Sequence, residues 1–281
     1  MIICKTPFRI SFFGGGTDFP EYYKNNKNAG VISTSINKYS YISLRHLPSF
    51  FDHKHRITYS IVEHVKNNNE IKHPSVKAIL NLFKQKDGLE IHYDGDVPAW
   101  SGLGTSSSFT VGLLNCMHTL NRNKINKKKL SQEAIFVEQN ILKEAVGSQD
   151  QIAAAYGEFN KINFSSNQKF TVNKINFKNN CKQILESNLL LMYTGIRRLS
   201  HKIESHKVKN LKDNNSSLNQ ISAIRDEALK YFQANNLCLK SIGNLMIESW
   251  KEKKGLSNKV SNDLIDEVLN IGLKNGAYGG K

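Results

Sequence analysis

The sequence predicts an α+β protein of two domains. Up to about residue 175, strand-like runs with period-2 alternation interchange with helical segments, whereas nearly all of the chain after residue 197 has helical periodicity. A shift in composition between about residues 165 and 188 indicates where the domains meet, and 281 residues suffice for one large or two modest domains. We therefore expect an N-terminal domain over residues 1–175 and a C-terminal domain over residues 176–281.

The expected elements follow this division. β-Branched and aromatic residues in alternation predict strands at Ile2–Phe13, Val31–Ile36, Tyr39–Leu44, Arg56–Ile61, Leu89–Tyr93, Phe159–Phe164, Phe170–Ile175 and Leu189–Tyr193. Helical periodicity predicts helices at Ser75–Lys84, Ser106–Leu120, Ser131–Val146, Ser200–Lys209, Ser217–Ala234, Leu237–Lys253 and Asn262–Lys274.

The charge balance is basic, with 39 Lys and Arg against 24 Asp and Glu and a net charge of +15. Nucleic acid, an acidic membrane surface and small anionic substrates are all compatible with such a charge. Zinc-finger, basic-region and RNP-type motifs are absent from the sequence. The sequence also has no apolar window near the roughly 18 residues of a membrane span and no signal peptide, and its four cysteines are scattered. We therefore expect a cytoplasmic protein with reduced cysteines.

The first motif is a glycine turn at the end of the first strand, where Pro7-Phe-Arg-Ile-Ser-Phe-Phe leads into Gly14–Gly16, Thr17 and Asp18. Glycines let the backbone approach a ligand closely or adopt positive φ, and Asp18 would then lie at the rim of the sheet. A plain glycine turn capped by Asp18 would explain the same residues.

The second motif joins a strand to the start of a helix. Gly102-Leu-Gly104 is followed by four consecutive hydroxyl residues, Thr105–Ser108, and then by an apolar helix. Backbone N–H groups and the positive end of the helix dipole would face an anion there. The motif lacks the Gly-Lys-Ser/Thr of a Walker A loop and is not a GxGxxG fingerprint. A Ser-rich N-cap accounts for one hydroxyl but not for four.

The third motif is a pair of acids, Glu138 and Asp150. On a helical wheel of Ser131–Val146 at about 100° per residue, Glu138 falls within an apolar arc. A carboxylate there is seldom buried without a cation or hydrogen-bond partners, although a partly covered helix would leave it in solvent. We expect Gly147 to end this helix. One acid for a metal and one for a proton is the minimum inventory for phosphoryl transfer to an alcohol. The arc consists of Ala134, Ile135, Ile141, Leu142, Ala145 and Val146.

Together the three motifs resemble those of the GHMP kinase superfamily, over essentially the whole chain. The first motif is most similar to the D-glycero-D-manno-heptose 7-phosphate kinases of the sugar-kinase branch. The resemblance implies a two-domain GHMP kinase fold, with a ribosomal-protein-S5-domain-2-like α/β domain followed by a ferredoxin-like domain. It also implies an enzyme that uses ATP and Mg²⁺.

The resemblance implies a role for each matched residue. Asp150 matches the general base, and Arg9 matches an arginine near the transferred phosphoryl group. Ser106 and Glu138 match the Mg²⁺ ligands. The positions that match the nucleotide-binding loop are Pro98, Gly102, Leu103, Gly104, Thr105, Ser106, Ser107 and Ser108. The positions that match sugar-binding residues are Gly15, Gly16, Thr17, Asp18, Thr194, Gly195 and Arg198. Arg198, with Lys202, would hold a distal phosphate, although a solvated basic helix start explains the same residues.

The implied reaction is phosphorylation of the anomeric hydroxyl of D-glycero-D-manno-heptose 7-phosphate to the 1,7-bisphosphate, for nucleotide-activated heptose and surface polysaccharide synthesis. The expected partners are ATP and a sugar phosphate, without nucleic acid or membrane, and a homodimer is compatible with the sequence. Two anionic ligands would also account for the basic charge. Two alternatives stay open: another sugar kinase of the superfamily, acting on fucose, galactose or another hexose, and a catalytically silent RNA- or ligand-binding fragment.

Two positions depart from the family pattern. Thr105 replaces a serine of the loop but keeps its hydroxyl. The third, glycine-rich motif of this branch begins Gly-Ala-x-Gly-Gly-Lys and continues into a run of glycines, whereas this chain has Gly276-Ala-Tyr-Gly-Gly-Lys281 and stops there. We therefore expect a C-terminal domain that lacks the end of this motif, and a fragment that folds without turnover is a third alternative.

Overall fold

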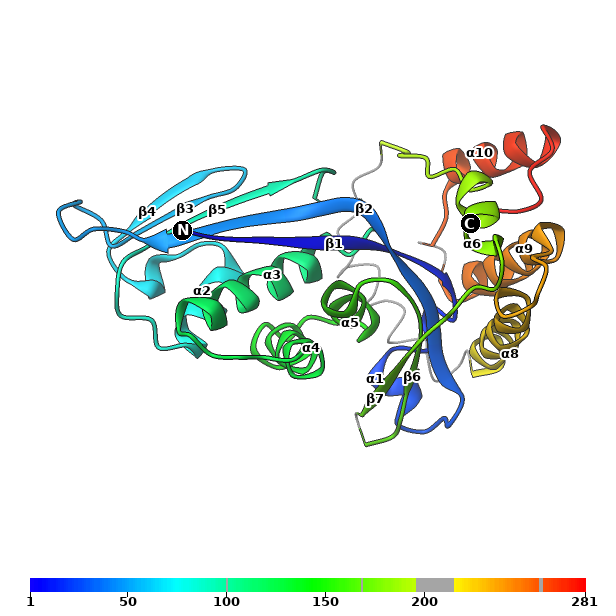
Figure 1. Cartoon of the computed structure of the whole chain (residues 1–281), viewed down its shortest axis with the longest axis horizontal. Coiled ribbons are helices and arrows are strands. Elements are labelled where there is room, and N and C mark those ends of the chain that lie inside the picture. The colour runs from blue at the N-terminus through cyan, green and yellow to red at the C-terminus, as the bar shows by residue number, and fades with distance from the viewer. Residues whose placement is uncertain (100, 168, 196–214, 258–259) are drawn as a thin grey trace. The chain divides into compact units, whose positions relative to one another are not determined.

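The computed structural model describes residues 1–99, 101–167, 169–195, 215–257 and 260–281 (Figure 1). The fold is α+β, as the sequence predicts, and its sheet is mixed. The chain forms two compact units, each assembled from several stretches, whereas the single boundary near residue 175 stays a prediction. Unit 1 comprises Met1–Arg9, Ser35–Val146 and Asp150–Gly157, and unit 2 comprises Ile10–Thr34, Gly147–Gln149 and Glu158–Lys281.

Unit 1 is built on a mixed sheet. The second half of β2 (Ala29–His46) pairs antiparallel with β5 (Leu89–Gly95), with Ile42 opposite Tyr93. β5 pairs in parallel with β3 (His55–Thr58), and β3 pairs antiparallel with β4 (Val62–Val65). β1 (Ile2–Phe13) has the predicted bounds and pairs with β2. The two strands predicted at residues 31–44 are therefore one long strand, and the sequence prediction missed β4.

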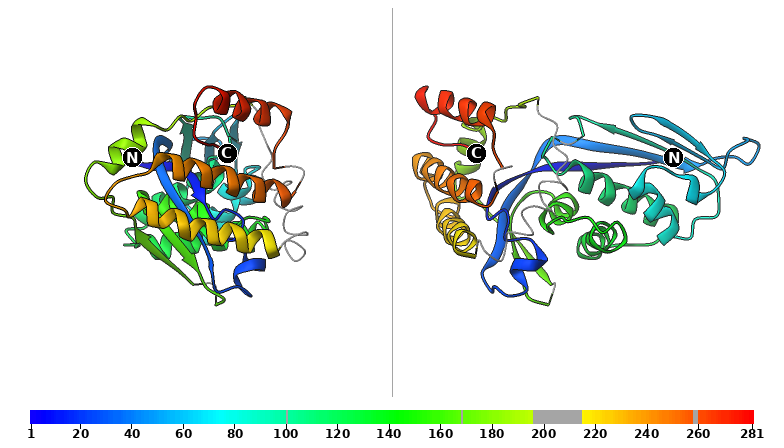
Figure 2. Two further views of the ribbon diagram at one scale, coloured as in Figure 1. Left: turned by 90° about the vertical axis from the view of Figure 1, so that its right-hand side faces the viewer. Right: turned by 180° about the vertical axis from the view of Figure 1, so that it is seen from behind.

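Helices cover one face of this sheet (Figures 1 and 2). Pro74 at the first position of α2 lacks an N–H that would be unpaired there, and the His73 side chain caps the helix. Buried apolar side chains of β2 and α3, such as Ile42 and Leu113, form one core, and each stabilises the fold by about 1.5–3 kcal/mol. The helical segments of unit 1 are the short 3₁₀ turn Asn68–Glu70, α2 (Pro74–Leu82), α3 (Thr105–Leu120), α4 (Lys127–Phe136), the π-helix Val137–Ile141 and α5 (Gln149–Tyr156).

Unit 2 has its own strands and its own core. The first half of β2 pairs antiparallel with β6 (Phe159–Phe164), which has the predicted bounds, and β6 pairs with β7 (Phe170–Lys174). Phe12, Phe159 and Phe232 pack with ring centroids 5.1–5.9 Å apart. α8 and α9 lie side by side (Figure 2). The helices of unit 2 are α1 (Pro20–Tyr23), α6 (Cys181–Ser187), α8 (Asn215–Phe232), α9 (Leu239–Gly255) and α10 (Asp263–Lys274).

The predicted strand Leu189–Tyr193 is wrong. These residues form no strand, and all five side chains are exposed, Leu190 by 85%. Apolar content alone does not make a strand, because a strand requires a neighbour for its backbone hydrogen bonds, and no described segment pairs with this run. After Lys174 the regular elements of the described residues are all helices, so the strands expected of a ferredoxin-like domain are not among them. The helix predicted at Ser200–Lys209 lies outside the described residues. None of the described helices is long and apolar enough to span a membrane.

Candidate active site

The glycine loop leads into the N-terminus of α3, which begins at Thr105, one residue before the predicted start. Gly102 (φ 81°) and Gly104 (φ 72°) both have left-handed backbone, which favours glycine over other residues. Within the described residues no side chain caps this helix end, and the first helical hydrogen bond runs from the Ser108 N–H to the Gly104 carbonyl (3.0 Å). The free N–H groups and the helix dipole therefore form a site suited to an anion.

The four hydroxyl residues of the loop lie in different surroundings. Ser106 is exposed, whereas Thr105, Ser107 and Ser108 are buried. The Ser108 hydroxyl donates to the Pro7 carbonyl (2.9 Å) and so ties α3 to β1. The Ser107 hydroxyl donates to Glu138 Oε2 (2.9 Å). The structure therefore brings Ser107, and not Ser106, to the acid with which Ser106 was expected to share a metal ion.

Arg9 connects Asp150 to the glycine loop. Its guanidinium donates from Nε to Asp150 Oδ1 (2.7 Å) and from Nη2 to Oδ2 (2.6 Å), in a bidentate pair that is among the strongest polar contacts in proteins. Nη1 donates to the Gly102 carbonyl (2.9 Å), and the Arg9 N–H donates to the Leu103 carbonyl (3.1 Å). The Asp150 side chain stays 24% exposed, so a substrate hydroxyl can reach it.

Glu138 is buried to 1% exposure, as the helical wheel predicts. Its Oε2 accepts hydrogen bonds from Ser107 Oγ (2.9 Å) and Gln151 Nε2 (2.5 Å), whereas Oε1 has no partner among the described residues. Burial raises the pKa of Glu138 to about 7, although the bonds from Gln151 and Ser107 act in the opposite direction. A buried carboxylate with one open oxygen fits a site for a hard cation, which prefers oxygen ligands.

The helix that carries Glu138 differs from the one predicted over Ser131–Val146. α4 ends at Phe136 and continues as the π-helix Val137–Ile141, in which the Leu142 N–H donates to the Val137 carbonyl (2.9 Å). The wheel assumed about 100° per residue, and a π turn breaks that angle. Consequently Ile141 is 38% exposed, and the predicted role of Gly147 in ending a helix is wrong.

Asp18 in unit 2 is buried instead of lying at the rim of the sheet, with 1% exposure. Its Oδ1 accepts from the Gly16 N–H (2.9 Å), and its Oδ2 accepts from the Gln149 N–H (3.4 Å). The Ser148 N–H donates to the Asp18 carbonyl (3.0 Å). A Cβ on Gly147 would stand 1.9 Å from Oδ2, so a larger residue does not fit there. Asp18 thus joins the glycine turn to the segment 147–149, a contact that sequence reasoning missed.

The remaining predicted site residues differ in their exposure to solvent. Thr17 is buried, and its hydroxyl bonds the carbonyls of Gly14 (2.8 Å) and Gly30 (2.9 Å). Pro98 and Gly195 are exposed, and Thr194 is half-buried. Arg198 and Lys202 lie outside the described residues.

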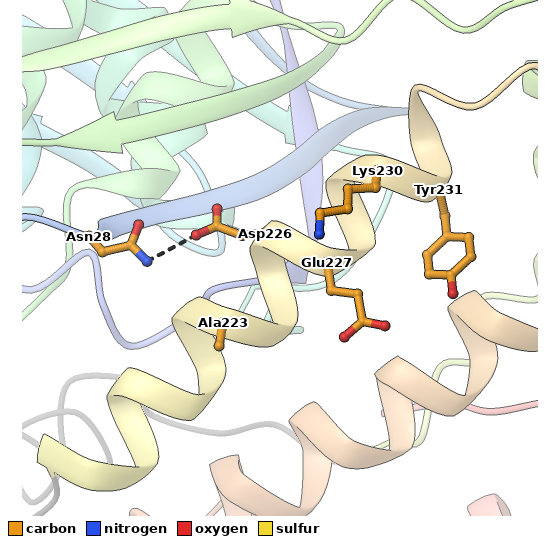
Figure 3. Close-up of a pocket in the computed structure, with 6 residues that line it drawn as sticks. All are labelled: Asn28, Ala223, Asp226, Glu227, Lys230 and Tyr231. Carbon is orange, nitrogen blue, oxygen red and sulfur yellow. Dashed lines mark hydrogen bonds between the residues drawn. The ribbon is translucent and has the colours of Figure 1, made fainter.

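A pocket of about 600 Å³ opens on α8 of unit 2 (Figure 3). Its polar side chains include Asn28, which donates to Asp226 Oδ2 (2.9 Å). None of the predicted site residues lines it. The lining residues are Asn28, Ala223, Asp226, Glu227, Lys230 and Tyr231.

Comparisons with known proteins agree with the motifs. The family model for the GHMP kinases N-terminal domain matches residues 71–158. A D-glycero-alpha-D-manno-heptose 7-phosphate kinase of Campylobacter jejuni is 30% identical, over 99% of this chain and 84% of that protein. A galactokinase of Pyrococcus furiosus is 26% identical, over 70% of this chain and 54% of that protein. The crystal structure of a D-glycero-D-manno-heptose 1-phosphate kinase from Bacteroides thetaiotaomicron superposes with a TM-score of 0.79 at 21% identity, covering 100% of this chain and 85% of that chain.

Proposed function

The chain belongs to the GHMP kinases, which are ATP-dependent phosphotransferases with an alcohol group as acceptor, and from this premise we propose that it phosphorylates the anomeric hydroxyl of D-glycero-D-manno-heptose 7-phosphate to the 1,7-bisphosphate. Among sugar kinases this substrate is favoured by the 30% identity to the Campylobacter enzyme over nearly the whole chain. We also propose that the protein works in the cytoplasm, where ATP and sugar phosphates are available.

The observation that carries the proposal is the bidentate Arg9–Asp150 pair, bonded through Gly102 to the loop that begins α3. Phosphoryl transfer requires little covalent chemistry from a protein, because positioning and electrostatic stabilisation account for most of the acceleration. In unit 1 these contacts hold together the Asp150 carboxylate, which can accept a proton, the Arg9 guanidinium, and the loop whose backbone N–H groups begin α3.

Asp150 would accept the proton of the attacking hydroxyl. Arg9 holds both of its oxygens, which keeps the carboxylate in one orientation, and each oxygen retains a lone pair for the substrate. The guanidinium would also offset negative charge that develops on the transferred phosphoryl group. The N–H groups at the start of α3 would bind the nucleotide phosphates, with Gly102 and Gly104 allowing close approach of the backbone.

A divalent cation fits this chain at Glu138, whose Oε1 is buried and has no hydrogen-bond partner among the described residues. Within the described residues no cluster of three or more His, Cys, Asp or Glu could hold a metal, so hydroxyls and nucleotide phosphates would complete its ligands. Glu138 and Ser107, which are in contact, and the exposed Ser106 are the candidate protein donors. When bound, Mg²⁺ would neutralise charge on the phosphates.

We propose the turn Gly15–Asp18 as the sugar-binding part of the chain, together with Thr194, Gly195 and Arg198. The support differs among these residues. For Gly15 to Asp18 the support is the family resemblance together with a packed turn, in which Asp18 Oδ1 accepts from the Gly16 N–H. For Thr194, Gly195 and Arg198 the support is the family resemblance alone.

The proposal is tested by a kinase assay of the wild-type chain with MgATP over a panel of acceptors. The panel holds D-glycero-D-manno-heptose 7-phosphate, the same heptose without phosphate, fucose and galactose. We expect kcat/KM to be at least about tenfold higher for the heptose 7-phosphate, with the new phosphate on the anomeric carbon by ³¹P NMR. A higher kcat/KM for fucose or galactose than for the heptose 7-phosphate would show that the proposed substrate is wrong. If the protein binds RNA with salt-sensitive affinity and ATP does not raise its thermal stability, it is a nucleic-acid-binding protein and the proposed kinase function is wrong.

A further inference from the structure

Two of the four cysteines, Cys4 and Cys116, lie on neighbouring elements of unit 1. Cys4 is on β1 and is half-buried, whereas Cys116 is on α3 and is buried to 1% exposure, and all four cysteines are free thiols. The two residues are 112 positions apart in the chain (116 − 4), so only the packing of β1 on α3 brings them to one place. The proposed phosphoryl transfer uses neither of them.

The contacts between β1 and α3 place the two cysteines opposite each other. A Cβ on Gly112 would stand 2.8 Å from Thr6 Oγ1, so the strand and the helix are in direct contact there. A step of two residues along a strand covers about 6.6 Å, and a step of four residues along a helix covers about 6 Å. These steps lead from Thr6 to Cys4 and from Gly112 to Cys116. The Asn115 side chain agrees with this register, because its Nδ2 donates to Cys4 Sγ (3.4 Å).

The two thiols are in contact, and their surroundings differ. Cys4 packs against the buried core cluster that contains Cys116. The contact with Cys116 lowers the pKa of Cys4 to about 6 against the effect of burial, and hydrogen bonds with Asn115 and Thr6 act in the same direction as that contact. The contact with Cys4, together with burial, raises the pKa of Cys116. Because the thiolate is the nucleophilic form of cysteine, Cys4 is the reactive member of the pair and Cys116 is the protonated one.

We propose that Cys4 and Cys116 form a site of reversible oxidative modification, at which a peroxide converts the two thiols to an intramolecular disulfide. The Cys4 thiolate attacks one oxygen of hydrogen peroxide, which breaks the O–O bond and gives a sulfenic acid and hydroxide. The Cys116 sulfur then attacks the Cys4 sulfur, the S–O bond breaks, and the hydroxyl group leaves as water with the thiol proton. In total the two thiols lose two electrons, and the peroxide is reduced to two molecules of water.

The disulfide would join β1 to α3 within unit 1 and close a loop of 112 positions in the unfolded chain (116 − 4). A cross-link over a long loop restricts the unfolded chain more than a cross-link over a short one. We therefore expect the oxidised protein to be more stable than the reduced protein. Because disulfides that form in a reducing compartment are transient, a thiol reductant should reverse the change.

The test treats the whole chain with a small molar excess of hydrogen peroxide and then alkylates the remaining thiols. Peptide mass spectrometry without reduction should find the peptide of Cys4 joined to that of Cys116, and the thiol count of the unfolded protein should fall from four to two. The midpoint of thermal unfolding should rise by at least about 5 °C. Dithiothreitol should restore the thiol count and the midpoint.

Three variants complete the experiment. Cys238→Ser is the matched control, because Cys238 is exposed and bonds Ser241, and it should keep both the cross-link and the thermal shift. Cys116→Ser should abolish both and leave Cys4 as a sulfenic acid that dimedone traps. Cys4→Ser should abolish the cross-link, the shift and the dimedone adduct.

A peroxide-treated wild type without the joined peptide, or with Cys4 joined to Cys238 instead, would overturn the proposal. An unchanged thermal shift in Cys4→Ser would also overturn it, and this variant alone decides if Cys116→Ser does not fold. None of these results bears on the proposed kinase function, since the disulfide requires neither ATP nor a sugar.

Discussion

Glu138 is a residue at which burial and ionisation oppose each other. Its folded-state pKa of about 7 lies above the ordinary value of 4.5, so the folded chain keeps a proton that the unfolded chain releases. By linkage, this group lowers the free energy of unfolding as the pH rises from about 4.5 to about 7, and the loss persists above that range. A cation at Oε1 would remove the loss by pairing with the charge.

Glu138→Gln should therefore be more stable than wild type at pH 8, by up to about 3 kcal/mol, and equally stable near pH 4.5. The amide keeps an oxygen for Ser107 and Gln151 and carries no charge to bury. Urea unfolding of both proteins between pH 4.5 and 8 measures the difference. Parallel stability curves would show that Glu138 does not titrate in this range, and added MgATP should stabilise wild type more than the variant.

The role of Asp150 as the general base is tested by replacing one of its carboxylate oxygens. Asp150→Asn keeps the shape of the side chain and one acceptor for Arg9 but removes the proton acceptor. We expect kcat to fall by about 10²- to 10⁴-fold with the affinity for ATP largely retained. The measurement is steady-state turnover beside nucleotide binding by calorimetry, with thermal unfolding as the folding control. Near-normal turnover would eliminate Asp150 as the base.

At the scale of elements, the contact between Asp18 and Gly147 joins the glycine turn to the segment that leads into Asp150. Because a Cβ on Gly147 would stand 1.9 Å from Asp18 Oδ2, Gly147→Ala must displace one of the two segments. We expect it to destabilise the protein by about 2 kcal/mol and to lower kcat. In an Asp18→Ala background the same substitution should cost less than about 0.5 kcal/mol, because the carboxylate is gone.

A double-mutant cycle by urea unfolding measures this coupling. Gly272→Ala is the matched control, since its nearest neighbour would be 3.8 Å away, and it should not couple to Asp18. Additive effects of Gly147→Ala and Asp18→Ala would contradict a direct contact. The kinetic readout separates positioning from stability, because a displaced Asp150 changes kcat more than the KM for ATP.

The strands and helices also show where the local sequence pattern is enough to predict the bounds of an element. β1 and β6 have the predicted bounds because β-branched and aromatic residues recur along both segments. The helix around Glu138 was mispredicted because a π turn is stabilised by packing and leaves no periodic signal. Leu189–Tyr193 has the composition of a strand but lacks a described partner, and a strand is defined by its partner.

At the scale of the whole molecule, the chain has two units with separate cores. The proposed nucleotide-binding loop belongs to unit 1, and the proposed sugar-binding turn Gly15–Asp18 belongs to unit 2. A non-hydrolysable ATP analogue should slow amide hydrogen exchange at the start of α3 in unit 1. The heptose 7-phosphate should slow exchange at residues 11–18 and 147–149 in unit 2. Exchange measured by mass spectrometry with each ligand separately checks this. Protection of the residue 11–18 peptide by the nucleotide alone would reverse the assignment.

The sequence by itself determined the family, the burial of Glu138, the glycine loop that leads into α3 and most strands and helices, because each of these depends on residues close together in the chain. The tertiary structure alone decided which groups meet. It brought Ser107 to Glu138, buried Asp18 against Gly147, and placed Cys4 beside Cys116, which is 112 positions later in the chain. Periodicity reports which face of an element is apolar, whereas the contacts of polar side chains arise only when distant segments pack.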